Sequence, residues 1–305
     1  MTDQPRPPAG ITLDDAPPLA GSRSGSAVLP GHLGDRPVVV KTTLHDSDEA
    51  TARADRELAA LLEPGLTVPR PPVLFHEVTQ GWTTIVLPRL ERATLSDAHW
   101  RHLLDDLASL HASTPPDRPR WHSEPWPGLD PVADLALLRE LWDDDESGAA
   151  LAWVTDHRHV LADDASAGPV EFTHGDCHLD NVVLDTTDAL AGRPLLIDWQ
   201  SAGWARGTDD LAFLLTRATA DPGLAALPGR DLIVRWYASA RERHGRGPLA
   251  ADDLDRAITA RQLLVLAFQY PAFAAYLSPA ATGRLRDEFV RLTTGATADF
   301  RRRRP

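Results

Sequence analysis

The sequence predicts an α+β protein of two lobes: a small lobe with an antiparallel sheet and one helix, and a large, mostly helical lobe. Three observations support this. Short β-branched runs broken by Gly and Pro fill the first part of the chain, helical patterns dominate the rest, and no long flexible linker separates them. With 305 residues, 43% of them hydrophobic, the chain can build a sizeable core. A cleft between two lobes is a common place for a ligand site.

The small lobe is predicted to span residues 11–88, after a polar, Pro-rich tail at 1–10. Its strand pattern begins near Leu19. Ser47 is followed by a segment of helix formers that Pro64-Gly65 ends, so one helix lies between three strands and two more. The runs with strand or helix character are 27–29, 37–41, 50–62, 73–75 and 82–87.

The large lobe is predicted to span residues 89–300, and a basic tail, 301–305, follows it. Only two short strand-like runs, 181–184 and 195–197, interrupt its helical patterns. The predicted helices are 100–112, 131–142, 151–161, 209–219, 231–244, 252–276 and 284–294.

The charge balance favours a small cationic partner. Acidic residues outnumber basic ones 44 to 31, a formal charge of −13, so we expect neither nucleic acid nor an anionic membrane as partner. Cys177 is the only cysteine, and no long apolar run is present, which predicts a soluble, cytoplasmic protein without a disulfide. Lys41 is the only lysine beside 30 arginines, which suggests a chemical role. The oligomeric state is not indicated.

The strongest local motif is His-Gly-Asp-Cys-His-Leu-Asp-Asn, residues 174–181, followed by Ile-Asp-Trp at 197–199. In phosphoryl transfer, an Asp that accepts the proton of the acceptor hydroxyl is followed five residues later by an Asn, and then by an Asp at the end of a strand. Asp176 and Asn181 keep this interval, and Asp198 follows a strand-like run. The pattern predicts Asp176 as the catalytic base and Asn181 and Asp198 as Mg²⁺ ligands.

Together with Leu-Ala-Ser-Leu-His-Ala at 107–112 and Gly-x-x-Asp-Leu-Ala at 207–212, these motifs resemble the aminoglycoside phosphotransferase family, the small-molecule branch of the protein-kinase-like fold. The resemblance covers most of residues 19–296. It implies a kinase that transfers the γ-phosphoryl group of ATP or GTP, with Mg²⁺, to a small-molecule hydroxyl. The acceptor it suggests is a cationic amino sugar or an antibiotic, which would confer antibiotic resistance.

The resemblance also implies the nucleotide site. It places Lys41 on the third strand, where its ammonium would reach the phosphates, with Glu57 as its helix partner and Glu49 as the competing candidate. Arg89 and Leu90 fall at the hinge between the lobes, where main-chain groups would meet adenine. The small residues of a phosphate-covering loop would be Gly21, Ser22, Ser24 and Gly25.

Other residues of these motifs have structural interpretations. We expect His174 to be a packed histidine, Cys177 to fill the loop, and Asp210 to hold the catalytic-loop backbone. A zinc site is disfavoured because no second Cys/His cluster exists. The side chains suggested for the acceptor pocket are Gln200, Trp204, Gln269 and Tyr270.

Two alternatives remain beside an antibiotic kinase, and two others are disfavoured. A P-loop enzyme is disfavoured because valine, not glycine, precedes Lys41, and a protein kinase because too few residues follow Asp198 for an activation segment. A metabolite kinase of the choline, homoserine or fructosamine type shares the fold. A catalytically silent nucleotide-binding protein would bind ATP without turnover.

Overall fold

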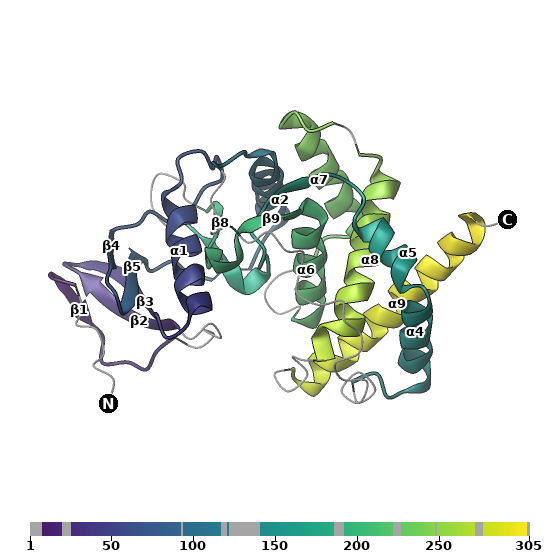
Figure 1. Cartoon of the computed structure of the whole chain (residues 1–305), viewed down its shortest axis with the longest axis horizontal. Coiled ribbons are helices and arrows are strands. Elements are labelled where there is room, and N and C mark those ends of the chain that lie inside the picture. Colours follow the sequence, from purple (N-terminus) through teal and green to yellow (C-terminus); the bar gives the residue numbers. More distant parts are fainter. Residues whose placement is uncertain are drawn as a thin grey trace.

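The computed structural model shows a small lobe that joins a large helical lobe through a short connection (Figure 1). None of the helices it describes is long and apolar enough to cross a membrane. The described residues are 8–19, 26–92, 94–116, 121, 141–185, 192–221, 227–247, 249–271 and 277–303.

The small lobe is an antiparallel five-stranded sheet in the order β1-β2-β3-β5-β4. Alternate β3 residues Val38 and Val40 are buried with Ile11 and Val86, as the period of two in a strand requires. The first strand differs from the prediction, because β1 precedes Leu19 and Leu19 itself is not in a strand. The strands are β1 (Ile11–Leu13), β2 (Ser26–Leu33), β3 (Arg36–Leu44), β4 (Phe75–Val78) and β5 (Trp82–Pro88).

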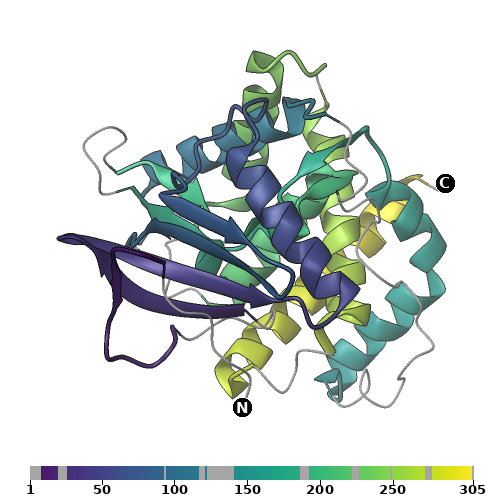
Figure 2. The same ribbon diagram turned by 60° about the vertical axis from the view of Figure 1, so that its left-hand side comes forward.

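Helix α1 (Asp48–Leu62) lies between the sheet and the large lobe (Figures 1 and 2). The Ser47 hydroxyl accepts the N–H of Ala50 and caps its first turn, as the sequence predicts. The helix packs against β3 and β5 on one side and against the segment after Asp198 on the other. A residue on α1 can therefore contact both lobes.

The helices of the large lobe follow the predicted order with shifted ends. The predicted helix 151–161 is divided at His157, and α8 ends before Gln269 instead of continuing to 276. Helix α9 is longer than predicted and includes Arg301, Arg302 and Arg303, so these residues of the expected basic tail are helical. The helices are α2 (Asp97–Ala112), α4 (Asp145–Asp156), α5 (Arg158–Ala165), α6 (Gly207–Ala220), α7 (Arg230–Arg243), α8 (Ala251–Phe268) and α9 (Pro279–Arg303).

Two small two-stranded sheets interrupt the helices. The expected pair is β7 (Val182–Leu184) with β8 (Pro194–Leu196). A second pair, β6 (Val170–Thr173) with β9 (Gly203–Arg206), was not predicted, because four-residue strands without clear alternation give little local signal. The predicted helix 131–142 lies outside the described residues except for 141 and 142.

Candidate active site

The hairpin of β7 and β8 places Asn181 beside Ile197, the residue before Asp198. Val182, the first residue of β7, pairs with Leu196, the last of β8, so the residues just beyond both ends become neighbours. The Ile197 N–H also donates to the Asn181 carbonyl at 3.0 Å. Asp198 then turns sharply with φ 63°, the only positive φ of a non-glycine residue in the described chain.

The loop that carries Asp176 is held by Asp210 at the start of α6. The two Asp210 carboxylate oxygens accept the backbone N–H groups of His174 at 2.8 Å and Gly175 at 2.9 Å. Gly175 has φ 78°, and a Cβ there would lie 2.1 Å from the Ser201 carbonyl oxygen, so only glycine fits. The structure thus contains the backbone contacts predicted for Asp210.

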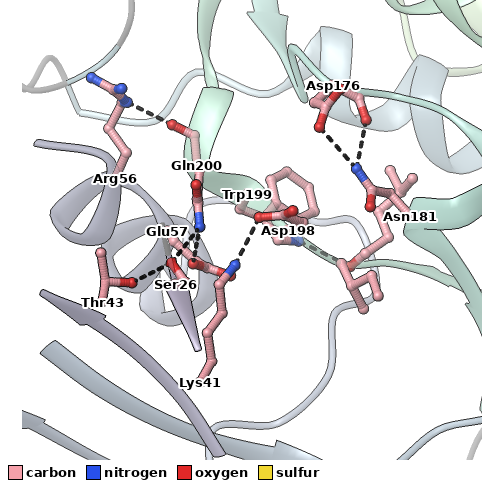
Figure 3. A network of polar contacts seen from close by, with 12 residues as sticks. Ser26, Lys41, Thr43, Arg56, Glu57, Asp176, Asn181, Asp198, Trp199 and Gln200 are labelled. Atoms are coloured by element: carbon pink, nitrogen blue, oxygen red, sulfur yellow. Dashed lines mark hydrogen bonds and ion pairs between the residues drawn. The ribbon is translucent and has the colours of Figure 1, made fainter. Parts of the chain in front are cut away.

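Asp176 is oriented by its neighbours in the loop. The Asn181 side-chain N–H donates to the Asp176 carboxylate at 3.1 Å and to its carbonyl at 3.0 Å (Figure 3). Burial would raise the pKa of Asp176, but His178 and Asn181 hold it below its usual value. Asp176 is therefore an ionised carboxylate at neutral pH and can accept a proton.

Asp180 anchors the same loop to two arginines. Arg92 lies 3.2 Å and Arg217 2.9 Å from its two carboxylate oxygens. His178 stands between Asp176 and Asp180, 3.6 Å and 3.5 Å from their oxygens. These cationic neighbours keep the pKa of Asp180 well below its usual range. Local pairing thus fixes both ends of the short segment between Asp176 and Asn181.

Lys41 joins the two lobes through two carboxylates. Its Nζ donates to Glu57 Oε1 and to Asp198 Oδ1, both at 2.8 Å (Figure 3). Burial alone would lower the pKa of Lys41, but the two carboxylates raise it to about 12. Glu49, the competing candidate, is mostly exposed and pairs with Arg53 and Arg56. Of the two glutamates, Glu57 is the one in contact with Lys41.

Gln200 does not lie where the acceptor prediction placed it. Its side chain is buried and donates to Glu57 and Ser26, on the small-lobe side of Asp198. Two of the other suggested acceptor residues belong to different core clusters: Trp204 packs beside Phe172 in the main core, and Tyr270 lies in the core of the C-terminal helices. The predicted pocket is therefore wrong for Gln200, because the sequence does not show which lobe its side chain faces.

His174 and Cys177 have the expected structural surroundings. His174 is fully buried, its Nε2 donates to the Ile197 carbonyl at 3.0 Å, and burial lowers its pKa. Burial together with Asp210 and Asp176 raises the pKa of the Cys177 thiol well above its usual value, so the thiol is a poor nucleophile.

The rest of the predicted nucleotide site is only partly visible. Gly21, Ser22, Ser24 and Gly25 lie outside the described residues. At the hinge, the Arg89 N–H donates to the Pro37 carbonyl at 3.1 Å, so it is already engaged. The prediction of a main-chain contact to adenine therefore rests on Leu90.

The donor set near Asp198 fits a hard divalent cation shared with phosphates. Asn181 donates its amide N–H to Asp176, which turns its amide oxygen away and leaves it available as a ligand. Lys41 occupies only one oxygen of Asp198. No group of three or more His, Cys, Asp or Glu ligands occurs among the described residues. Two protein oxygens suit Mg²⁺, which commonly keeps waters and substrate phosphates as further ligands.

Part of the acid excess lies in two runs, 143–146 and 252–255, and several of their carboxylates pair with arginines. Asp143 and Asp144 lie within 3.7 Å of Arg286. Asp253 contacts Arg256, and Asp255 is 2.6 Å from Arg230. These carboxylates therefore contribute little uncompensated negative charge.

The sequence matches the model of one known protein family. The model of the family described as "Phosphotransferase enzyme family" matches residues 15–258. None of the curated proteins matches the chain. A GDP complex of aminoglycoside 2'-phosphotransferase-IIIa is similar in structure, with 13% identity, a TM-score of 0.57 and coverage of 92% of this chain and 93% of that one.

Two further structures share the fold. An amicoumacin kinase in complex with AMP-PNP, Ca²⁺ and Ami is 14% identical, with a TM-score of 0.54 and coverage of 93% of this chain and 89% of that one. A Plasmodium vivax ethanolamine kinase is 10% identical, with a TM-score of 0.51 and coverage of 95% and 82%.

Proposed function

This chain belongs to the phosphotransferase enzyme family and is a small-molecule phosphotransferase, and we propose that it moves the γ-phosphoryl group of ATP to a hydroxyl of a cationic amino sugar or antibiotic. One observation supports phosphoryl transfer: two groups of side chains lie around the end of the β7–β8 hairpin. The first group is Lys41 with Glu57 and Asp198, and the second is Asp176 with Asn181. The first suits nucleotide phosphates and the second suits an acceptor hydroxyl.

In this proposal, each side chain has one task. Asp176, ionised and oriented by Asn181, accepts the hydroxyl proton as the acceptor oxygen bonds to phosphorus and the bond to the departing ADP oxygen breaks. The Lys41 ammonium holds the phosphates. Asn181 and Asp198 would hold Mg²⁺, which supplies positive charge to the phosphate oxygens when bound.

The acceptor class is supported by the acid excess of the chain and by the family resemblance. Two proteins of similar fold are an aminoglycoside phosphotransferase and an amicoumacin kinase. A metabolite kinase of the choline, homoserine or fructosamine type is the second candidate, favoured by the arginine pairing of the acidic runs. Because several carboxylates of those runs are already paired, attraction of a polycation is weaker.

A coupled ADP-release screen over amino sugars, antibiotics, amino alcohols, hydroxy amino acids and fructosamines tests both candidates. Phosphorylation of an amino sugar or antibiotic would support the first, and turnover only with an amino alcohol, a hydroxy amino acid or a fructosamine would replace it with the second. ATP binding with no turnover for any acceptor would favour a silent nucleotide-binding protein.

A further inference from the structure

Gln200 occupies a junction between the lobes. It lies two residues after Asp198, in a short 3₁₀ turn over Trp199–Ser201, and its side chain points toward the small lobe (Figure 3). Its amide Nε2 lies 3.3 Å from Glu57 Oε2 and 3.4 Å from the Ser26 hydroxyl. An amide nitrogen has two hydrogens, so it can serve both acceptors.

The backbone of Gln200 is held by the same helix. The Arg56 Nε donates to the Gln200 carbonyl at 2.7 Å. Arg56 and Glu57, adjacent on α1, thus hold the main chain and the side chain of one residue. On the other side, the Ser26 hydroxyl is 2.7 Å from the Thr43 hydroxyl on β3, two residues beyond Lys41. Gln200 is therefore held directly by β2 and α1, and Ser26 links it to β3.

These contacts close a ring through the phosphate site. Lys41 binds one oxygen of Glu57, and Gln200 donates to the other. Gln200 is joined through Trp199 to Asp198, which accepts from Lys41. Because Glu57 is almost fully buried, at 1% exposure, an unpaired oxygen there would be costly. Both of its oxygens are satisfied only while Gln200 is in place.

We propose that Gln200 is a positioning residue that fixes the Glu57 carboxylate, and through it Lys41 and Asp198, in the arrangement that receives nucleotide phosphates. This rests on the proposed function, because it assumes that Lys41 meets the phosphates of ATP. Without the amide donor, Glu57 can rotate and Lys41 loses a defined position. Nucleotide binding is then weakened, although Gln200 does not touch the nucleotide.

The test is the dissociation constant of ATP with Mg²⁺, measured by titration calorimetry on folded protein. Gln200→Met keeps the length of the side chain but removes its donor, and we expect ATP to bind roughly tenfold more weakly. Gln262→Met is the matched control. Gln262 is also fully buried and donates to Thr216, but it lies on α8, so its substitution should leave the ATP dissociation constant unchanged.

A double-mutant cycle separates positioning from general destabilisation. If Gln200 acts through Glu57, adding Gln200→Met to Glu57→Gln should weaken ATP binding little beyond Glu57→Gln alone. If Gln200→Met does not fold, Gln200→Glu provides the second variant. It places a carboxylate against Glu57 and should weaken binding, and Glu57→Gln in the same chain should restore part of it.

The proposal would be overturned if Gln200→Met or Gln200→Glu bound ATP as tightly as the parent. It would also be overturned if the loss of ATP affinity in the double mutant equalled the product of the losses in the two single mutants. Failure of the parent chain to bind ATP would instead contradict the proposed function. The two failures are distinguishable because the parent is measured in the same titration.

Discussion

Lys41 owes its usefulness to being compact. Its Nζ stands 2.8 Å from each of two carboxylates in a site where the lysine is only 8% exposed, so there is little space for a larger cation. A guanidinium is a planar fork with five donors, whereas an ammonium is a point charge that two carboxylates and a phosphate can share. In the proposed phosphate role, a chain with 30 arginines would therefore still need one lysine here.

We expect Lys41→Arg to lower kcat/KM on the order of 10²-fold, because a small displacement of a positioned group is that costly. The variant should remain folded, because the positive charge between the two carboxylates is kept. Steady-state kinetics and thermal unfolding of the same preparation measure both. A fully active Lys41→Arg enzyme would contradict a phosphate role for this lysine.

Asp176→Asn should lower kcat by roughly 10²- to 10⁴-fold, the usual range for loss of a general base, because an amide cannot accept the hydroxyl proton. ATP affinity should change little, since Asp176 is assigned to the acceptor. Single-turnover kinetics with calorimetric ATP binding test this. Near-normal turnover of a folded Asp176→Asn protein would exclude Asp176 as the base.

The metal assignment predicts a different signature for Asn181. Activity should disappear with EDTA and return with Mg²⁺ or Mn²⁺, because two protein oxygens alone bind a divalent cation weakly. Asn181→Ala should raise the Mg²⁺ concentration needed for half-maximal rate, while saturating Mg²⁺ recovers part of the activity. Phosphoryl transfer in metal-free buffer would contradict the assignment.

Among the helices, a buried hydrogen-bond chain joins α7 to the loop that carries Asp176. Arg241 pairs with Glu171 through two 2.7 Å contacts and donates to the Tyr237 hydroxyl at 3.1 Å. The Tyr237 hydroxyl is also hydrogen-bonded to His111 Nδ1 at 2.6 Å. His111 Nε2 then donates to Asp210, 3.2 Å away, which holds the loop backbone.

Tyr237→Phe removes the middle of this chain. It should lower the free energy of unfolding by about 1–3 kcal/mol, because His111 and Arg241 each lose a buried partner. We also expect a lower kcat with an unchanged ATP dissociation constant, since Asp210 orients the loop of Asp176 but not the nucleotide side. Denaturant unfolding and kinetics measure these effects. If ATP affinity fell by the same factor as kcat, the effect of Tyr237→Phe would not be confined to the loop of Asp176.

Across the whole molecule, the features predicted from the sequence are those that depend on residues close together in the chain. The order of strands around α1, the Ser47 cap and the interval from Asp176 to Asn181 are readable because they involve neighbours in the chain. The pairing of β6 with β9 and the contacts of Gln200 were missed. Gln200 meets Glu57 across 143 residues and Ser26 across 174, and nothing near Gln200 in the sequence indicates which lobe its side chain faces.

Charge pairing likewise depends on residues that are far apart in the sequence. The excess of acids suggested a field that attracts cations, yet many carboxylates are bound to arginines from distant helices. Arg261 of α8 holds Asp209 of α6 through contacts of 2.5 and 2.7 Å, with both side chains at most 7% exposed. By contrast, Arg291 and Glu288 form a pair within α9 in which the arginine is 58% exposed.

Stability should therefore depend on the few buried pairs. Arg261→Met leaves the Asp209 carboxylate buried without its partner, and we expect a loss of about 3–5 kcal/mol at pH 7, whereas Arg291→Gln should cost under about 1 kcal/mol. Burial already raises the pKa of Asp209 above its usual value in spite of Arg261, and removing Arg261 raises it further. Below that raised pKa the lone carboxyl is neutral, so the cost of Arg261→Met should shrink as the pH falls. Urea unfolding of the parent and both variants at pH 7 and pH 5 tests this, and equal costs for the two arginines would contradict it.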